Sequence, residues 1–182
     1  MGNNGFVTSK KSEPDTPASE EKPKIPMPDE APLTDALNED GVTTKSEKRP
    51  RVMVAEDEAL IRLDLIELLK EQGYDVVGEA ADGEAAVTMA RELEPDLVVM
   101  DVKMPKQDGI AAASIIAEER IAPVVMLTAF SQRELVERAR EAGAMAYVVK
   151  PFDASDVVPA IEIAMARYAE IRAVEDLSLI HI

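Results

Sequence analysis

Residues 97–105, Leu-Val-Val-Met-Asp-Val-Lys-Met-Pro, decide the fold: four apolar residues end in one carboxylate, and a Lys-Met-Pro turn follows. An apolar run this short is typical of a strand that is buried on both faces, as in a parallel sheet. Asp101 then lies at the carboxyl end of the strand, the edge where open α/β sheets place their chemistry. An isolated Asp in this position is most often only the end of a strand. Here three other apolar runs also end in polar groups, at Glu56-Asp57, Thr128 and Lys150, so we expect these groups to converge on Asp101.

From residue 51 onward, short apolar runs alternate five times with amphipathic segments. We expect strands at residues 52–55, 75–80, 97–101, 124–128 and 144–149. Helices are expected at residues 57–72, 82–93, 131–142 and 153–174. A further helix is expected after a loop that contains Gly109, through Ile115 and Ile116 to about Glu119. In the first helix, the residues at helical spacing that indicate the apolar face are Leu60, Leu63, Ile66 and Leu69.

Five βα units with short connections predict an α/β fold with a doubly wound, five-stranded parallel sheet and helices on both faces. The strand at 75–80 ends without reactive groups, which suits an edge position in the flavodoxin-like order 2-1-3-4-5. A dinucleotide-binding fold is disfavoured because no Gly-x-Gly-x-x-Gly follows the first strand. Asp82 and Ser131 are suitable N-caps for the second and fourth helices.

Composition limits the class of protein. The chain of 182 residues has a formal net charge of −16, 46% hydrophobic residues and no cysteine. Disulfides, thiolate metal sites and a cysteine nucleophile are therefore excluded. So acidic a chain is a poor ligand for a phosphate backbone, and we expect no nucleic acid to bind these residues. No stretch resembles a secretory signal or approaches the length of a membrane span, so we expect a cytoplasmic protein without membrane contact.

The chain divides into three parts by composition. Residues 1–49 are rich in Pro, Ser, Thr, Glu and Lys and poor in large apolar residues, which predicts a disordered acidic tail. Residues 50–170 contain the alternating pattern and form the expected folded domain. Residues 171–182 follow it as a separate short segment.

The acidic residues at the strand ends indicate a cation site. Glu56, Asp57 and Asp101 would bring three carboxylates together, and like charges at close range raise one another's pKa. A divalent cation relieves that repulsion, and ligation by oxygen alone favours Mg²⁺. The alternative is that residues 56–58 are only an acidic helix N-terminus, stabilised by the helix dipole.

The remaining strand ends suit phosphoryl transfer. Lys150 is placed to neutralise phosphoryl oxygens, and Thr128 can donate its hydroxyl to one of them, while Asp101 is the nucleophile. A surface lysine and a β-branched strand residue are the simpler alternatives for Lys150 and Thr128. The single histidine, His181, lies in the terminal segment, so the phosphodonor is expected to be another molecule.

Together these residues resemble the receiver domain of bacterial two-component response regulators. The matching pieces are Val54–Glu58, Val99–Pro105, Asp108-Gly109, Leu127–Ala129 and Tyr147–Phe152. The resemblance implies that Asp101 accepts a phosphoryl group from a sensor histidine kinase. It also implies that Mg²⁺ is held by Glu56, Asp57, Asp101 and the backbone carbonyl of Lys103.

The same resemblance implies a switch. In receivers, the Thr at position 128 moves toward the phosphoryl group and the aromatic residue, here Tyr147, rotates into the space that it leaves. This repacks the face made by the fourth helix, the fifth strand and the fifth helix. The result is a population shift controlled by a local change of charge.

A narrower resemblance is to actinobacterial antitermination regulators. It is visible in the pieces Glu56–Arg62, Ala129–Arg133 and Ala142–Tyr147. In that family, the last receiver helix continues into a coiled coil and a helical RNA-binding (ANTAR) domain. Residues 171–177 could begin the coiled coil, whereas the RNA-binding domain is missing from this sequence. We therefore expect RNA contact only through the missing domain, and a monomer or weak dimer for the residues present.

Residues 177–182, Leu-Ser-Leu-Ile-His-Ile, break the charged helical pattern. Read as CTG-TCT-CTT-ATA-CAC-ATC, they are a translated transposase sequencing adapter, so we expect an artefactual tail on a truncated gene. A genuine apolar C-terminal peptide is the alternative, and a genomic read through the locus distinguishes the two.

The expected function is a phosphoacceptor switch and not an enzyme. Two rivals remain open. One is a haloacid-dehalogenase-like phosphatase, which also uses an Asp nucleophile with Mg²⁺, but Asp101-Val102-Lys103 lacks the Asp-x-Asp that this class requires. The other is a stand-alone receiver that acts through protein contacts, in the extreme case without taking phosphate.

Overall fold

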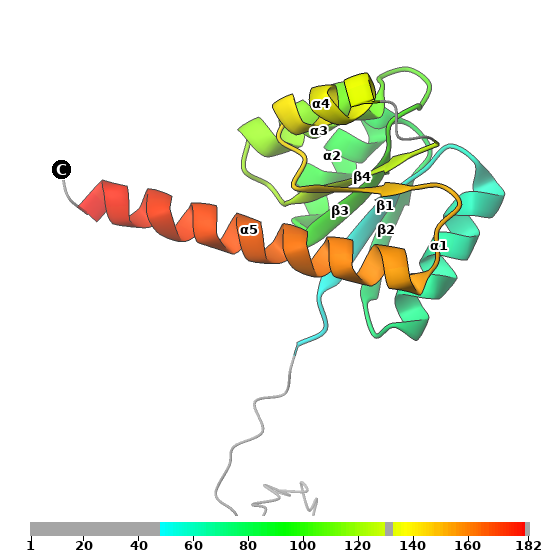
Figure 1. Ribbon diagram of the computed structural model, residues 1–182, viewed down its shortest axis with the longest axis horizontal. Coiled ribbons are helices and arrows are strands. Elements are labelled where there is room, and N and C mark those ends of the chain that lie inside the picture. Colours follow the sequence, from blue (N-terminus) through cyan, green and yellow to red (C-terminus); the bar gives the residue numbers. More distant parts are fainter. Residues whose placement is uncertain (1–47, 130–132, 181–182) are drawn as a thin grey trace, which may run out of the picture. The chain divides into compact units, whose positions relative to one another are not determined.

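The computed structural model describes residues 48–129 and 133–180. The strands are β1 (Arg51–Ala55), β2 (Asp75–Ala80), β3 (Leu97–Asp101), β4 (Val124–Thr128) and β5 (Ala146–Val149). The helices are α1 (Ala59–Glu71), α2 (Gly83–Leu93), α3 (Gly109–Glu118), α4 (Arg133–Glu141) and α5 (Ala154–Ile180). Strands and helices alternate along the chain, as the sequence predicts (Figure 1).

The five strands form one parallel sheet in the order β2-β1-β3-β4-β5. The predicted fold class and strand order are therefore confirmed. β2 lies at one edge, so the four strands whose ends contain reactive side chains are neighbours. Parallel strands have their carboxyl ends at the same edge of the sheet, and this arrangement brings those side chains together.

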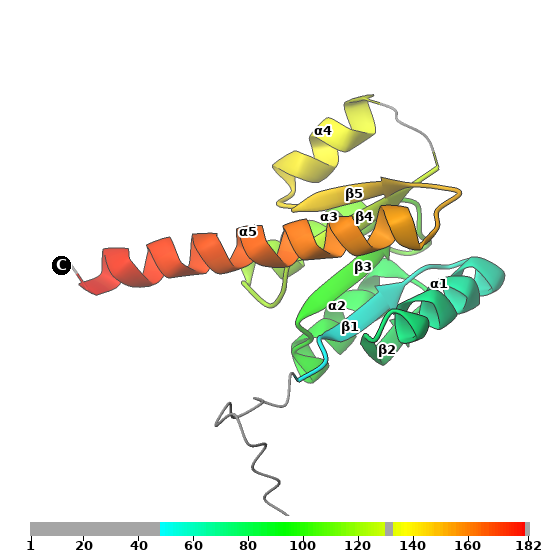
Figure 2. The ribbon, with the colours of Figure 1, turned by 60° about the horizontal axis from the view of Figure 1, so that its bottom comes forward.

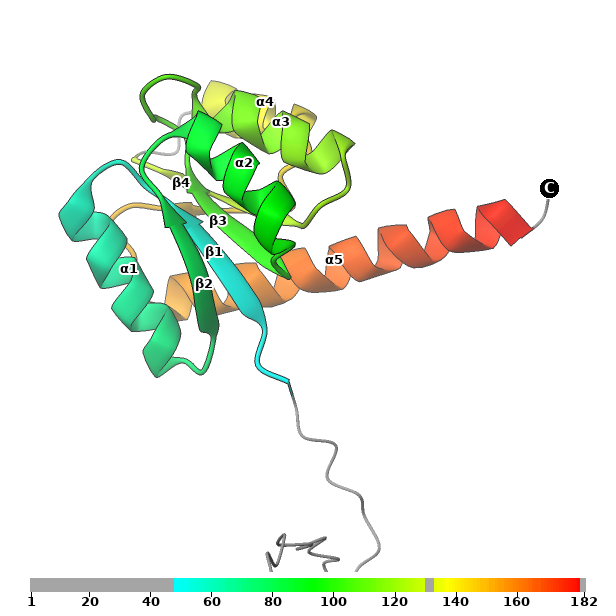
Figure 3. The same ribbon diagram turned by 180° about the vertical axis from the view of Figure 1, so that it is seen from behind.

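Alternation along the strands divides the core into two halves. Met53, Met100 and Met126 point to the face covered by α2, α3 and α4. Val54, Val99 and Leu127 point to the opposite face, against α1 and α5. Figure 2 shows α4 and α5 on the two sides of the sheet, and Figure 3 shows α2 and α3 from behind. Because both faces are covered, the central strands are continuous apolar runs.

Helix α1 differs from the prediction in its start and in its apolar face. It begins at Ala59 and not at residue 57, because the Glu56 carboxylate accepts the Glu58 N–H and turns the chain first. Leu60 and Leu63 are exposed, whereas the buried residues are Leu65, Ile66 and Leu69. A series with a step of three residues drifts by about 60° per step around an α-helix, so its two ends face opposite ways.

The other element boundaries lie within about one residue of the expected ones, except that α3 already begins at Gly109, which we expected in a loop, and that β5 and α5 differ. The expected start of α4 at residue 131 lies outside the described residues. β5 begins at Ala146, two residues later than expected, and α5 continues to Ile180 instead of ending near residue 174. The Tyr168 hydroxyl donates to the carbonyl of Arg120, and the Arg120 guanidinium pairs with Glu175, so contacts with the body of the domain continue along α5. Asp82 caps α2 as predicted, by accepting the Ala85 N–H.

Ser131 and the expected tail at 1–49, apart from its last two residues, lie outside the described residues. In the part of the chain that the structure describes, no helix has an apolar stretch long enough to cross a membrane.

Candidate functional site

The ends of β1, β3, β4 and β5 meet at the carboxyl edge of the sheet. Glu56 directly follows β1, Asp101 ends β3, Thr128 ends β4 and Lys150 directly follows β5. The strand register aligns these ends, since Ala55 lies opposite Met100, Asp101 opposite Leu127, and Thr128 opposite Val149. The predicted convergence on Asp101 is therefore present in the structure.

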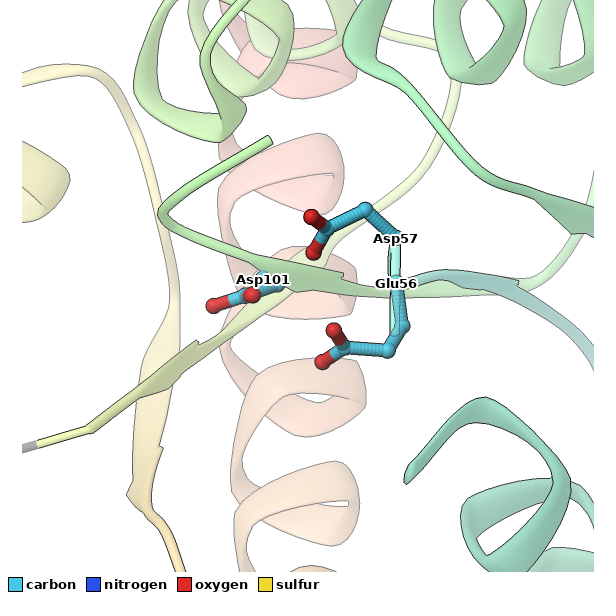
Figure 4. Close-up of side chains that lie close together, drawn as sticks. All are labelled: Glu56, Asp57 and Asp101. Carbon is cyan, nitrogen blue, oxygen red and sulfur yellow. The ribbon is translucent and has the colours of Figure 1, made fainter. Parts of the chain in front are cut away.

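Three carboxylates form a compact cluster at this edge. Glu56, Asp57 and Asp101 each offer a carboxylate oxygen, and these oxygens all lie within 4.8 Å of one another. Figure 4 shows the three carboxylates gathered in one place, from the loop after β1 and from the end of β3. Glu56 is fully buried and Asp101 is 6% exposed, whereas Asp57 is exposed. The cluster thus opens to solvent on the side of Asp57.

In the part of the chain that the structure describes, one ammonium group, that of Lys150, contacts this cluster. Lys150 Nζ lies 2.7 Å from Glu56 Oε2 and 3.1 Å from Asp101 Oδ2. Its side chain is 16% exposed, so the ion pairs are largely shielded from water. When all three carboxylates are ionised, the four side chains together have an excess of negative charge.

The burial of these groups changes their pKa values. Burial raises the pKa of Glu56 above its ordinary value, while hydrogen bonds from Lys150 and from the Glu58 N–H act against that rise. For Lys150, burial acts to lower the pKa, but hydrogen bonds to Glu56 and Asp101 outweigh it and raise the pKa. Lys150 is therefore a permanent cation at neutral pH.

A small cavity lies beside the Asp101 carboxylate. Its volume is about 120 Å³, and its lining includes Asp101, Lys103, Thr128 and Lys150. The Thr128 side chain is buried at the end of β4. A carboxylate, a hydroxyl and an ammonium thus line one small space, which suits a tetrahedral anion such as a phosphoryl group.

Two close approaches fix the Asp101 backbone. The Gly109 N–H donates to the carbonyl of Val102, and a methyl group on Gly109 would overlap the carbonyl oxygen of Asp101. Only glycine fits this position, because the start of α3 crosses directly over the end of β3. The Asp-Gly pair at 108–109 thus combines the α3 cap, where Asp108 accepts the Ala111 N–H, with the close contact to Asp101.

Lys103 and Tyr147, the remaining predicted site residues, are not part of the carboxylate cluster. The Lys103 side chain is exposed, and its backbone N–H lies 3.4 Å from Asp101 Oδ1. Tyr147 on β5 is 51% exposed and lines a groove between α4, β5 and α5, away from the carboxylate cluster.

Among the described residues, sequence reasoning did not identify Arg62 as a residue that contacts the site. Arg62 on α1 donates from Nη1 to the carbonyl of Glu56, at 2.7 Å. In the sequence, the available clue is that Arg62 lies on the first helix, six residues after Glu56. The helical periodicity does not distinguish it from a surface arginine.

The residues present fit a magnesium ion. Among the described residues, Lys150 is the ammonium that pairs with this cluster. A buried carboxylate beside two others is costly unless further positive charge is available. The donor set consists of oxygen alone and opens to solvent, which matches the preference of Mg²⁺ for a few carboxylates and retained water. Glu56, Asp57 and Asp101 are the residues that would hold it.

A parallel sheet in this order, with an acidic cluster, a lysine and a threonine at its carboxyl edge, defines a response-regulator receiver. Residues 52–162 match the Response regulator receiver domain family, and the chain belongs to that family. The family resemblance stated from the sequence is thereby confirmed.

Among named relatives, the transcriptional regulatory protein PdtaR of Mycobacterium tuberculosis strain H37Rv is 67% identical over 125 residues. That match covers 69% of this chain and 61% of PdtaR, so the chain spans about three fifths of the length of this relative. Chemotaxis protein CheY of Thermotoga maritima is 39% identical over 112 residues, which are 61% of this chain and 93% of that protein.

Comparison with solved structures also identifies a receiver fold. A chain of the CheX-CheY-BeF3-Mg²⁺ complex from Borrelia burgdorferi superposes with a TM-score of 0.58 at 32% identity. The superposition covers 61% of this chain and 85% of that one. The kinship with actinobacterial regulators rests on the 67% identity to the mycobacterial protein.

Proposed function

We propose that this chain is a switch that Asp101 turns on by accepting a phosphoryl group from a sensor histidine kinase. The single observation that supports this most strongly is the position of the Asp101 carboxylate. It borders a cavity of about 120 Å³ together with Thr128 and Lys150, and it belongs to the cluster of three carboxylates.

In the proposed step, an Asp101 carboxylate oxygen attacks phosphorus and forms an O–P bond. The P–N bond to the donor's imidazole breaks, its electron pair stays on the nitrogen, and the imidazole takes up a proton from water. Asp101 needs no general base, because an ionised carboxylate is already a nucleophile. Lys150 balances charge on the phosphoryl oxygens, and the Thr128 hydroxyl donates to one of them.

Glu56, Asp57, Asp101 and the carbonyl of Lys103 are the proposed magnesium ligands. When bound, Mg²⁺ supplies positive charge that offsets both the carboxylates and the transferring group. The carboxylate cluster supports this assignment. So does the likeness to a chain of the CheX-CheY-BeF3-Mg²⁺ complex from Borrelia burgdorferi.

The proposed output surface is the face of α4, β5 and α5. A groove of about 640 Å³ lies there, and its lining includes Tyr147 and Ile163. On phosphorylation, Thr128 moves toward the phosphoryl group and Tyr147 rotates inward from its exposed position. The change in this surface is the signal that a partner or an output segment reads.

The proposed output is transcription antitermination through RNA. PdtaR is named as a transcriptional regulatory protein, and only three fifths of its length is matched here. We assign RNA binding to an ANTAR-type segment outside these residues and none to the receiver itself, whose chain has a net charge of −16. On this proposal the receiver is a regulatory switch and not an enzyme, and it is a monomer or weak dimer.

Acetyl phosphate with Mg²⁺ tests the central step. We expect intact mass spectrometry to show one added phosphoryl group on the wild type and none on Asp101→Asn. Asp75→Asn, at the exposed start of the edge strand β2, is the matched control and should label like the wild type. Undiminished labelling of Asp101→Asn would move the acceptor to another residue.

A further inference from the structure

We propose that Arg62 is a positioning residue for the cation site: its guanidinium fixes the Glu56–Asp57 peptide and thereby sets where the Asp57 carboxylate points. This inference rests on the proposed magnesium-dependent function and adds a residue on α1 to the site. The key contact is the hydrogen bond from Arg62 Nη1 to the Glu56 carbonyl, at 2.7 Å.

The polar groups of Glu56 are held from four directions. Its N–H donates to the carbonyl of Ala80 on β2 at 3.0 Å, and its Oε1 accepts the Glu58 N–H at 3.0 Å. Its Oε2 accepts from Lys150, and its carbonyl accepts from Arg62. Of these four contacts, the one from Arg62 is made to the carbonyl group of the peptide bond between Glu56 and Asp57.

Because the peptide bond is planar, this contact also restricts the backbone orientation of Asp57. The Glu56 carbonyl and the Asp57 N–H belong to one planar unit, so fixing the direction of the carbonyl fixes the plane from which Asp57 begins. A donor with a full positive charge makes a shorter and stronger hydrogen bond than a neutral one. The Arg62 side chain is 20% exposed, and this shielding strengthens the bond further.

Asp57 needs such support more than its neighbours do. Glu56 and Asp101 are buried, and each pairs with Lys150, whereas Asp57 is exposed and lies in the loop before α1. Packing therefore does not hold the Asp57 side chain. Its position depends on the backbone of the loop, and Arg62 ties that backbone to α1.

The ion pair of Arg62 does not explain its position. Arg62 Nε lies 3.8 Å from Glu79 Oε1, and the Glu79 side chain is 59% exposed. An ion pair this long and this exposed to solvent contributes little to stability. The short contact to the Glu56 carbonyl is the stronger one, and the two contacts can be separated by mutation.

The test is a calorimetric titration of the full chain with Mg²⁺. We expect Arg62→Met to weaken magnesium affinity about tenfold, the range found for groups that orient metal ligands. Arg62→Lys, which restores a charged donor, should recover part of the loss. Glu79→Gln and Arg91→Met, which remove ion pairs without touching the Glu56 carbonyl, should bind like the wild type.

Two further readouts separate positioning from general destabilisation. At saturating Mg²⁺, the labelling rate of Arg62→Met should return to within about twofold of the wild type, so that the magnesium requirement changes and the maximal rate does not. Without metal, hydrogen exchange at the Asp57 and Glu58 amides should be faster in Arg62→Met and unchanged in Arg91→Met. If Arg62→Met does not fold, Arg62→Lys is judged by the same two readouts.

Wild-type affinity in Arg62→Met, or an equal loss in Arg91→Met, would overturn the inference. If the wild type itself binds no Mg²⁺, the proposed function fails. The exchange rates then still decide whether Arg62 fixes this loop, because they are measured without metal.

Discussion

Two clusters of charged side chains in this molecule differ in burial and in balance. Arg91 on α2 and Glu119 after α3 form a pair with two hydrogen bonds, and their side chains are 51% and 41% exposed. At the carboxyl edge of the sheet, Lys150 is 16% exposed and contacts the fully buried Glu56. Asp57 and Asp101 lie beside them.

The two clusters differ in whether their charges are balanced. The exposed pair has one positive and one negative charge, so nothing further is needed to balance it. The cluster at the sheet edge has three carboxylates, of which Glu56 and Asp101 are buried, and among the described residues Lys150 is the one ammonium that contacts it. Unbalanced charge is costly in such a place. A fold gains little stability from such an arrangement, which supports the proposal that it binds a cation and a phosphoryl group.

Removing the cation from each cluster should have unequal effects. We expect Lys150→Met to lower the free energy of unfolding by about 3 kcal/mol, because it leaves Glu56 buried without a counter-charge. Arg91→Met should cost much less, since water solvates the released Glu119. Denaturant unfolding of both variants without Mg²⁺ measures the contrast. Equal losses would show that burial does not distinguish the two clusters.

The backbone beneath the buried cluster should be intolerant of added volume. Gly109→Ala would place a methyl group on the Asp101 carbonyl oxygen, so we expect a loss of about 1–3 kcal/mol and labelling reduced more than about tenfold. Gly73→Ala is the matched control: its φ is +88°, with no atom within 4 Å of the added group. It should cost about 1 kcal/mol through backbone strain and label normally. Normal labelling of Gly109→Ala would contradict the close packing at Asp101.

The exposed pair should show a simple dependence on pH. Hydrogen bonds from Arg91 lower the pKa of Glu119 below its ordinary value of 4.5. The pair's contribution is therefore complete above that value and is lost as the pH falls through the lowered pKa. The gap in unfolding free energy between wild type and Arg91→Met should be constant above pH 4.5 and shrink below it. A gap that stays constant into the acid range would contradict the assigned cause.

Much of the fold could be predicted because buried parallel strands leave continuous apolar runs in the sequence. Residues 97–101 show this most clearly, and the polar groups at the strand ends predicted which edge of the sheet holds the site. The convergence of Glu56, Asp101 and Lys150 follows from topology alone, since parallel neighbours end at one edge.

The rest depends on contacts that periodicity does not encode. The exposure of Leu60 and Leu63 follows from which face of α1 packs against the sheet, and a series with a step of three residues spans more than one face. Arg62 looks like any surface arginine until the loop after β1 is folded, because its partner is a backbone carbonyl. The extension of α5 to Ile180 depends in part on Arg120, which lies far from α5 in sequence.

The most direct test of the central claim is a crystal structure with Mg²⁺ and beryllofluoride, a tetrahedral mimic of the phosphoryl group. We expect the metal among the carboxylates of Glu56, Asp57 and Asp101, and the beryllofluoride on Asp101 in contact with Lys150 and Thr128. Metal or beryllofluoride bound elsewhere, with Asp101 unmodified, would contradict the central claim.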